Sequence, residues 1–309
     1  MENKNLLLQL GIARLSFLST EDKLKLENNL DNVASLALLS IDEISFIVGR
    51  VVNTKEWPVE NFEKLVLRDY SLMDTYKIDF IHCKDTNYPV MLTQVYDCPY
   101  ALFARGNSAI LNSPSVAIVG TRKASMSGMK AAFNFSKDLV ASGYTVVSGL
   151  AMGIDTAAHS GALSSLGKTI AVLACGLDNL YPAVNKKLAS SIIQNGGCIV
   201  SEYSPCEPPL KWRFPERNRI ISGLSEAVVV MESPVKSGAL ITADFAIEQN
   251  RDLFFHESAL VAQERYKVLA KQKGYSEKIQ SQRSVQHYIE EGAPCISSVK
   301  ELVTSLFIK

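Results

Sequence analysis

Apolar residues follow two different spacings along this chain. In residues 1–70 they recur three and four positions apart, which is the period of short helices that bury one face. After residue 110, short β-branched apolar runs alternate with helix-length segments. The pattern therefore predicts a small all-helical domain at 1–70 and an α/β domain at 71–309.

The β-branched runs of the second part are continuously apolar, as strands buried on both faces are. We predict strands at 115–120, 144–149, 169–175, 198–203, 227–233 and 252–255, with helices at 126–142, 153–167, 185–196, 216–225 and 238–251. This alternation forms βαβ units, which give a parallel sheet with helices on both faces. Ligands of such sheets bind at the carboxyl ends of the strands, so functional residues are expected there.

The N-terminal part contains helix signals but no chemical motif. Ser40 and Asp42 lie near an expected helix start. Three apolar groups mark expected helix faces: Leu24, Leu26 and Leu30; Val33, Leu36, Leu38 and Leu39; Ile44, Ile47 and Val48. A SAM-like or helix-hairpin-helix bundle fits this pattern, and we favour a packing or interaction role for it.

Composition and charge leave the function open. Of the 309 residues, 47% are hydrophobic and 21% are charged, as in ordinary globular proteins. Lysine and arginine number 32, and so do aspartate and glutamate. The absence of net charge excludes a uniformly basic coat protein for nucleic acid, so local charge has to decide.

The six cysteines and the N-terminus bear on the compartment. No two cysteines form a C-x-x-C pair, and we expect buried thiols in a reducing compartment rather than disulfides or zinc ligands. The first residues lack the features of a signal peptide, and no apolar run reaches the roughly 18 residues of a membrane span. We therefore expect a cytoplasmic protein with no membrane partner. We also expect no metal and no cofactor.

Two glycine loops follow the first two predicted strands of the α/β part. Gly120, Thr121, Arg122, Lys123 and Ser125 precede one helix, and a second loop begins with Ser148 and Gly149. Glycines, hydroxyl groups and a helix N-terminus supply the backbone N–H groups and the positive dipole end that bind phosphates. Neither loop matches G-x-x-x-x-G-K-[ST] or G-x-G-x-x-G, so we predict anion binding without a P-loop or a dinucleotide fingerprint.

The segment KWRFPERNR (211–219) combines four cations with two aromatic residues. Cations can follow the phosphates of a single-stranded nucleic acid, and an aromatic ring can stack on any base. We predict that Phe214, just before the proline of an expected helix start, is the stacking residue. Trp212 is expected to face the core.

Several longer motifs resemble the DNA-processing protein A family, also called DprA or Smf. NYPVMLTQVYDCPYALFARGN (87–107) resembles the segment that leads into the family's extended Rossmann-like domain, which we accordingly expect here. The other motifs are GTR (120–122) with Ser125 and Gly128, SGLAMGIDTAAHSGAL (148–163), GLDNLYPAVNKKL (176–188), SEYSPCEPPLKWRFPERNRIISGLSEAVVVMES (201–233) and KSGALITADFAIEQNR (236–251).

The resemblance implies a dimeric protein that binds single-stranded DNA, protects incoming DNA and loads the RecA recombinase during natural transformation, without catalysis. It implies that Arg122 and Lys211 contact the DNA strand and that Phe214 stacks on a base. Arg217, Asn218 and Arg219 correspond to the family's R-N-R motif. The nucleic-acid-binding residues predicted in total are Gly120, Thr121, Arg122, Lys123, Ser125, Ser148, Gly149, Lys211, Phe214, Arg217, Asn218, Arg219, Ser237 and Gly238.

The C-terminal part departs from the family pattern. A charged segment at 256–283, which we predict to be helical, replaces a V-P-G turn and a short loop; it is either a peripheral insertion or a diverged surface helix. In VKELVTSLF, apolar residues at helical spacing predict a dimer interface of Val299, Leu302, Val303 and Leu306, or else packing on the chain's own domain. The sequence ends at Lys309, so we expect no C-terminal winged-helix domain.

Catalytic functions find less support. The four histidines have no metal-ligand spacing, and His159 is expected to pack or cap rather than act as a base. Ser125 and Ser148 lack a G-x-S-x-G elbow. The alternative is a nucleoside monophosphate phosphoribohydrolase of the Lonely Guy type, but the P-G-G-x-G-T-x-x-E motif is absent at 233–242, and Glu248 lies further along the helix.

Overall fold

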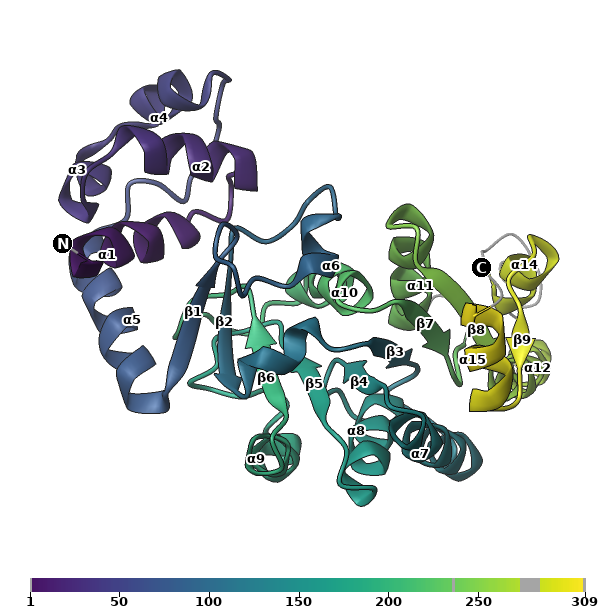
Figure 1. Ribbon diagram of the computed structural model, residues 1–309. Coiled ribbons are helices and arrows are strands. Elements are labelled where there is room, and N and C mark those ends of the chain that lie inside the picture. The colour runs from purple at the N-terminus through teal and green to yellow at the C-terminus, as the bar shows by residue number, and fades with distance from the viewer. Residues whose placement is uncertain (1, 235–236, 273–283, 308–309) are drawn as a thin grey trace.

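A nine-stranded sheet organises the molecule in the computed structural model, which describes residues 2–234, 237–272 and 284–307 (Figure 1). The strand order is β1-β2-β6-β5-β4-β3-β7-β8-β9. The strands are β1 (Ile78–His82), β2 (Ala101–Gly106), β3 (Ser115–Val119), β4 (Thr145–Ser148), β5 (Thr169–Val172), β6 (Cys198–Ser201), β7 (Ala227–Val230), β8 (Asp252–His256) and β9 (Cys295–Ile296).

All six predicted strands are confirmed as β3 to β8, which pair in parallel. The expectation of a wholly parallel sheet is wrong at one edge, where β1 pairs with β2 and β2 with β6 in antiparallel fashion. The predicted α/β class with an extended Rossmann-like sheet is confirmed, and β1 and β2 extend it.

Helices cover both faces of the sheet, as predicted (Figure 1). On one face, α10 (Arg213–Gly223) and α11 (Gly238–Glu248) pack on one set of alternating strand residues. On the other face lie α7 (Met126–Ala141), α8 (Ile154–Ser164) and α9 (Lys186–Gln194). The short helical segments α6 (Val90–Thr93), η1 (Ser108–Asn112) and η2 (Ala183–Asn185) lie in connections.

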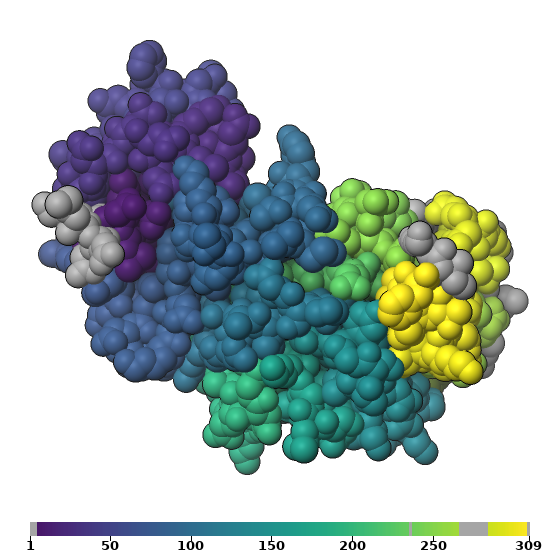
Figure 2. Space-filling view, viewed as in Figure 1, coloured from purple at the N-terminus to yellow at the C-terminus, as the bar shows by residue number. Residues whose placement is uncertain are grey.

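Five helices form the N-terminal lobe, drawn in purple and blue in Figure 2. They are α1 (Glu2–Ala13), α2 (Thr20–Asn29), α3 (Val33–Leu38), α4 (Ile41–Val48) and α5 (Phe62–Tyr76). Ser40 caps α4 in a capping box with Glu43, which confirms the predicted helix start. Leu38 is 84% exposed at the end of α3, so its placement on a packed face was wrong. Helix α5 crosses residue 70, and the division at that position remains a prediction.

The N-terminal lobe shares a hydrophobic cluster with the sheet. Leu8 and Leu10 of α1 belong to the same buried cluster as Phe103 of β2 and Ala171 of β5. Burial of apolar area is the main favourable term in folding, so this shared cluster holds the lobe against the α/β part. Among the described residues, no helix combines the length and the apolar character that crossing a membrane requires.

The C-terminal helices pack on the chain's own core. The predicted helix at 256–283 is confirmed as α12 (Glu257–Gln272), while 273–283 lie outside the described residues. Helices α14 (Val285–Glu290) and α15 (Val299–Phe307) follow.

The predicted dimer residues lie on the inner side of α15. Val299 and Leu302 are 5% and 0% exposed in the cluster beneath α7, because the connection through β9 turns this face of α15 toward the sheet. Val303 and Leu306 pack against the same cluster and are half-buried. The assignment of Val299 and Leu302 to a dimer interface was therefore wrong, and the packing alternative holds for them.

A buried ion pair joins the lobe to the sheet and should make stability depend on pH. His82 Nε2 in β1 lies 3.1 Å from Glu27 Oε2 in α2. Burial opposes the charged imidazole, but hydrogen bonds with Cys83 and Glu27 outweigh burial and raise the pKa of His82 to about 9. A raised pKa stabilises the fold below the ordinary value of 6.5, and this contribution is lost as pH rises toward 9.

We expect the free energy of unfolding to fall by about 3 kcal/mol as pH rises through this window. Urea denaturation across that range measures the decline. The Glu27→Gln variant, which removes the carboxylate partner, should be less stable at low pH and should lose the part of the pH dependence that Glu27 supplies. An equal decline in both proteins would assign the effect to other groups.

Candidate nucleic-acid interface

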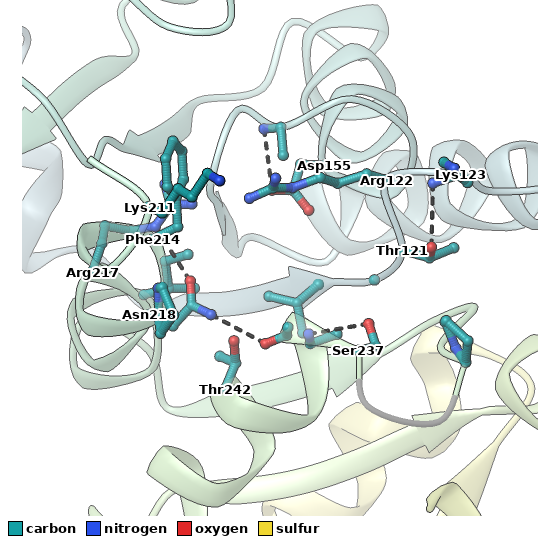
Figure 3. Close-up of a pocket in the computed structure, with 18 of the residues that line it drawn as sticks. Thr121, Arg122, Lys123, Asp155, Lys211, Phe214, Arg217, Asn218, Ser237 and Thr242 are labelled. Carbon is teal, nitrogen blue, oxygen red and sulfur yellow. Dashed lines mark hydrogen bonds between the residues drawn. The ribbon is translucent and has the colours of Figure 1, made fainter. Parts of the chain in front are cut away.

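A pocket of about 800 Å³ lies at the carboxyl ends of the central strands (Figure 3). The loop after β3 and the starts of α10 and α11 form its walls. The structure brings ten of the predicted residues to it: Gly120, Thr121, Arg122, Lys123, Lys211, Phe214, Arg217, Asn218, Ser237 and Gly238. Ser125, Ser148, Gly149 and Arg219 are not among the residues that line it.

The accessible chemistry of the pocket is cationic and aromatic. Arg122, Lys123 and Lys211 are exposed, and the Arg122 guanidinium lies 5.0 Å from the centre of the Phe214 ring. Tyr181, which is not among the predicted site residues, packs its ring against that of Phe214, with the ring centres 5.6 Å apart. It belongs to the GLDNLYPAVNKKL motif, but no neighbouring cation marked it in the sequence.

The first glycine loop does not offer the empty anion site that we predicted. The Glu232 carboxylate, which follows β7, accepts hydrogen bonds from the Ser125 backbone N–H (2.8 Å) and from its hydroxyl group (2.7 Å). Glu232 is only 4% exposed, and it fills the position beside the N-terminus of α7. A Cβ atom on Gly128 would lie 2.0 Å from Glu232 Oε2, so the glycine makes room for this carboxylate rather than for a phosphate.

The second glycine loop is closed in the same way. Asp155 Oδ2 accepts from the backbone N–H groups of Gly149 and Ala151, both at 3.2 Å. Ser148 is fully buried, and its hydroxyl donates to the Ile118 carbonyl. Burial raises the pKa of Asp155, while the charge of Arg217 lowers it. Gly149 therefore supports two residues that line the pocket, Asp155 and Arg217, and Ser148 is part of the sheet beneath it.

The three residues of the R-N-R motif have different surroundings. The Arg217 guanidinium is buried and donates to the carbonyl groups of Gly149 and Val172. Asn218 donates to the Gly238 carbonyl over 3.1 Å and so ties α10 to the start of α11. Because successive helix residues point about 100° apart, Arg219 faces away from the pocket.

Arg219 forms ion pairs on that other side of α10. Its guanidinium contacts Asp97 at 3.0 Å and Glu202 at 2.5 Å. It also lines a separate pocket, together with α2 and the α6–β2 connection. The grouping of Arg219 with the pocket cations is therefore corrected.

The predicted orientation of Trp212 was also wrong. Trp212 is 49% exposed at the N-cap of α10, and the Arg213 guanidinium lies 5.1 Å from its ring. Helix α10 begins at Arg213, so residues 212–214 follow a helical turn rather than the alternation we assumed. Phe214 is half-buried within the first turn and faces the pocket.

Two other predictions concern possible catalytic groups. His159 is fully buried, and its Nδ1 lies 2.7 Å from Thr169 Oγ1. Burial, with a contribution from Arg217, lowers its pKa to about 3, so a packing role is confirmed. Glu248 is exposed at the end of α11 opposite to the pocket, so it is not placed to act as the glutamate that the phosphoribohydrolase alternative needs.

The cysteines are more varied than predicted. Cys175 and Cys198 are buried thiols, whereas Cys295 is exposed. Within the described part of the chain, no cluster of three or more histidine, cysteine or acidic residues could hold a metal ion.

The fold is thus an extended Rossmann-like α/β sheet that carries exposed cations and aromatic rings in a pocket at its strand ends. Residues 79–307 match the family model described as DNA recombination-mediator protein A. The chain therefore belongs to that family.

Individual relatives agree with this assignment. The chain is 41% identical to DNA processing protein DprA of Streptococcus pneumoniae over 71% of each chain, and 34% identical to protein Smf of Borreliella burgdorferi over 80% of this chain and 78% of that one. The X-ray structure of the S. pneumoniae protein superposes with a TM-score of 0.69 at 34% identity and covers 95% of both chains. A structure of DNA processing protein A from Helicobacter pylori, described for its single-stranded DNA binding mode, gives a TM-score of 0.59 at 26% identity and covers 74% of this chain and 96% of that one.

Proposed function

We propose that this protein is a recombination mediator that binds single-stranded DNA at the described pocket. The observation that carries this proposal is the placement of Phe214 beside the exposed cations Arg122 and Lys211 in one pocket. The cations neutralise phosphates, and the ring stacks on a base of any sequence. The binding mode named for the H. pylori relative supports the same ligand.

The shape of the site favours a single strand. Phe214 is half-buried in the pocket wall, so a base reaches its ring only when the base is unpaired and turned out of a stack. The Ser125 amide of the first loop is taken up by Glu232, and the Gly149 and Ala151 amides of the second loop by Asp155. In this proposal, side chains of the rim hold the phosphates.

The wider role follows the family. We propose that the protein acts in the cytoplasm, protects incoming DNA, loads the RecA recombinase during natural transformation and has no catalytic activity of its own. A homodimer belongs to the same proposal, and its interface must lie outside Val299 and Leu302, which are buried within the protomer.

The test is a comparison of single-stranded and duplex DNA binding across a range of salt concentrations. We expect tighter binding of the single strand with little sequence dependence. If Lys211 neutralises one phosphate, Lys211→Ala should weaken binding and lower the slope of log K against log salt by about 0.7. Fluorescence anisotropy with labelled oligonucleotides measures both quantities.

Lys137→Ala provides the matched control, because Lys137 is exposed on α7 but does not line the pocket. Its affinity and salt slope should equal those of the wild type. Equal affinity for single-stranded and duplex DNA would overturn the proposed ligand. Hydrolysis of nucleoside monophosphates by the wild type would instead revive the enzyme alternative.

A further inference from the structure

Tyr181 lines the pocket from a different loop than Phe214. The residue is 47% exposed, although its ring packs against that of Phe214. Upstream, the Gly176 backbone N–H donates to the Glu207 carbonyl over 2.9 Å. Downstream, the Asn185 amide donates to the Leu150 carbonyl (2.8 Å) and to the Thr156 hydroxyl (2.9 Å). These bonds anchor the loop on both sides of Tyr181.

The two rings meet at an angle of 62°. Successive bases in a stacked strand are nearly parallel, so a stacked pair of bases cannot lie flat on both rings. A strand that contacts both rings has to open the angle between two neighbouring bases. The geometry therefore selects a strand whose bases are splayed at this point.

We propose that Tyr181 is a second base-contacting residue and that the pocket binds a bent, unstacked single strand. This inference rests on the proposed function. Arg122 lies 5.0 Å from the Phe214 ring centre, so a phosphate on its guanidinium belongs to the nucleotide on Phe214 or to its neighbour. Arg122 and the two aromatic rings would then contact the DNA at the same bend.

A preference among single strands follows from the bend. Thymine bases stack weakly on one another, whereas adenine bases stack strongly, and preferences of non-specific binders arise from stacking and backbone flexibility. Oligo-dA has to lose its own stacking in order to reach both rings. We therefore expect oligo-dT to bind more tightly than oligo-dA of the same length.

The test compares wild-type protein with Tyr181→Ala and Tyr181→Phe on oligo-dT and oligo-dA. Tyr181→Ala should weaken oligo-dT binding about tenfold with an unchanged salt slope, because stacking carries no charge. Tyr181→Phe should retain wild-type affinity. Tyr96→Ala is the control, since Tyr96 is fully exposed and does not line this pocket.

A contact must be separated from mere support of Phe214. In the Phe214→Ala background, loss of Tyr181 should weaken binding further if Tyr181 touches a base of its own. An oligonucleotide with 5-iododeoxyuridine should crosslink to Tyr181 under ultraviolet light, and mass spectrometry of the peptides identifies the site.

The outcomes distinguish a failure of the proposed function from a failure of the inference about Tyr181. A wild-type protein that fails to bind oligo-dT would end both the proposed function and this inference. Tight wild-type binding that Tyr181→Ala leaves unchanged would end this inference alone. So would an effect that vanishes without Phe214 and yields no crosslink, because Tyr181 would then only support that ring. Binding of oligo-dA as tight as that of oligo-dT would contradict the bent strand.

Discussion

Replacing Arg217 with methionine should lower the free energy of unfolding by about 3–5 kcal/mol, which is the usual cost of leaving a buried charge without its partner. Arg217 is 4% exposed, and burial lowers its pKa to about 10, against the opposing charge of Asp155, so it stays charged at neutral pH. Without the guanidinium, the Asp155 carboxylate and the Gly149 and Val172 carbonyl groups lose their positively charged neighbour. Urea denaturation measures the loss.

The effect should depend on Asp155. Adding Asp155→Asn to Arg217→Met removes the uncompensated charge, so the double variant should recover part of the lost stability. Lys211→Met is the matched control, because this exposed cation precedes the same helix and should change stability by less than about 0.5 kcal/mol. An Arg217→Met protein with wild-type stability and weakened DNA binding would show that Arg217 contacts the strand directly.

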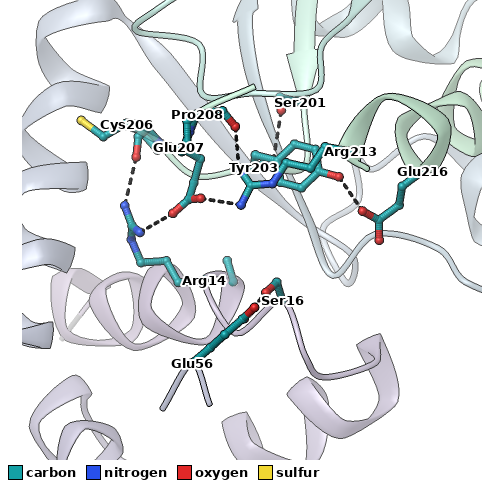
Figure 4. Close-up of polar contacts among 12 residues, drawn as sticks. Arg14, Ser16, Glu56, Ser201, Tyr203, Cys206, Glu207, Pro208, Arg213 and Glu216 are labelled. Atoms are coloured by element: carbon teal, nitrogen blue, oxygen red, sulfur yellow. Dashed lines mark hydrogen bonds and ion pairs between the residues drawn. The ribbon is translucent and has the colours of Figure 1, made fainter. Parts of the chain in front are cut away.

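Arg14→Met should destabilise the protein by a similar amount, about 3–5 kcal/mol, through the contact between the lobe and the sheet. Arg14, directly after α1, forms ion pairs with Asp69 of α5, which is fully buried, and with Glu207. Figure 4 shows the contact between Arg14 and Glu207. Glu207 also accepts from Arg213 at 2.6 Å, so the network reaches the first turn of α10. Removing Arg14 leaves the buried Asp69 carboxylate without its cationic partner.

The dependence on pH identifies that carboxylate. Burial already raises the pKa of Asp69, and Arg14 holds it down. In Arg14→Met the pKa should rise further, so the stability deficit should shrink as pH falls and Asp69 becomes neutral. Lys77→Met, which breaks an exposed ion pair with Asp74, should cost at most about 1 kcal/mol. A deficit that is constant with pH would assign the loss to packing instead.

The sequence predicted the central sheet well because its strands are buried on both faces. Strands β3 to β8 are continuous apolar runs and stand out against polar connections. Strand β1 at the sheet edge contains polar Asp79 and His82 among its five residues, and β9 has two residues, so neither gives a clear apolar run. Strand β2 runs antiparallel without a βα repeat around it, which removed the pattern on which the other assignments relied.

The sequence predicted only in part which residues lie together, because charge and aromatic character are visible in sequence, whereas the partners of each residue are not. Lys211, Arg122 and Phe214 meet in one pocket as predicted. Glu232, which fills the first loop, lies more than one hundred residues from Ser125, and nothing in the local sequence marks it as a partner. Arg219 carries the same charge as Arg217, and only the turn of the helix and its acidic neighbours separate their roles.

The carboxylates of Asp155 and Glu232 also bear on how tightly the pocket would bind a free mononucleotide. Because Glu232 takes up the Ser125 amide and Asp155 the Gly149 and Ala151 amides, a free nucleotide would depend, among the described residues, on the exposed cations and aromatic rings of the pocket. A polymer engages these weak contacts together, and each engaged nucleotide raises the effective concentration of the next. In a protein with the proposed function, discrimination between strand and monomer would thus come from covalent connection, without any single tight phosphate site.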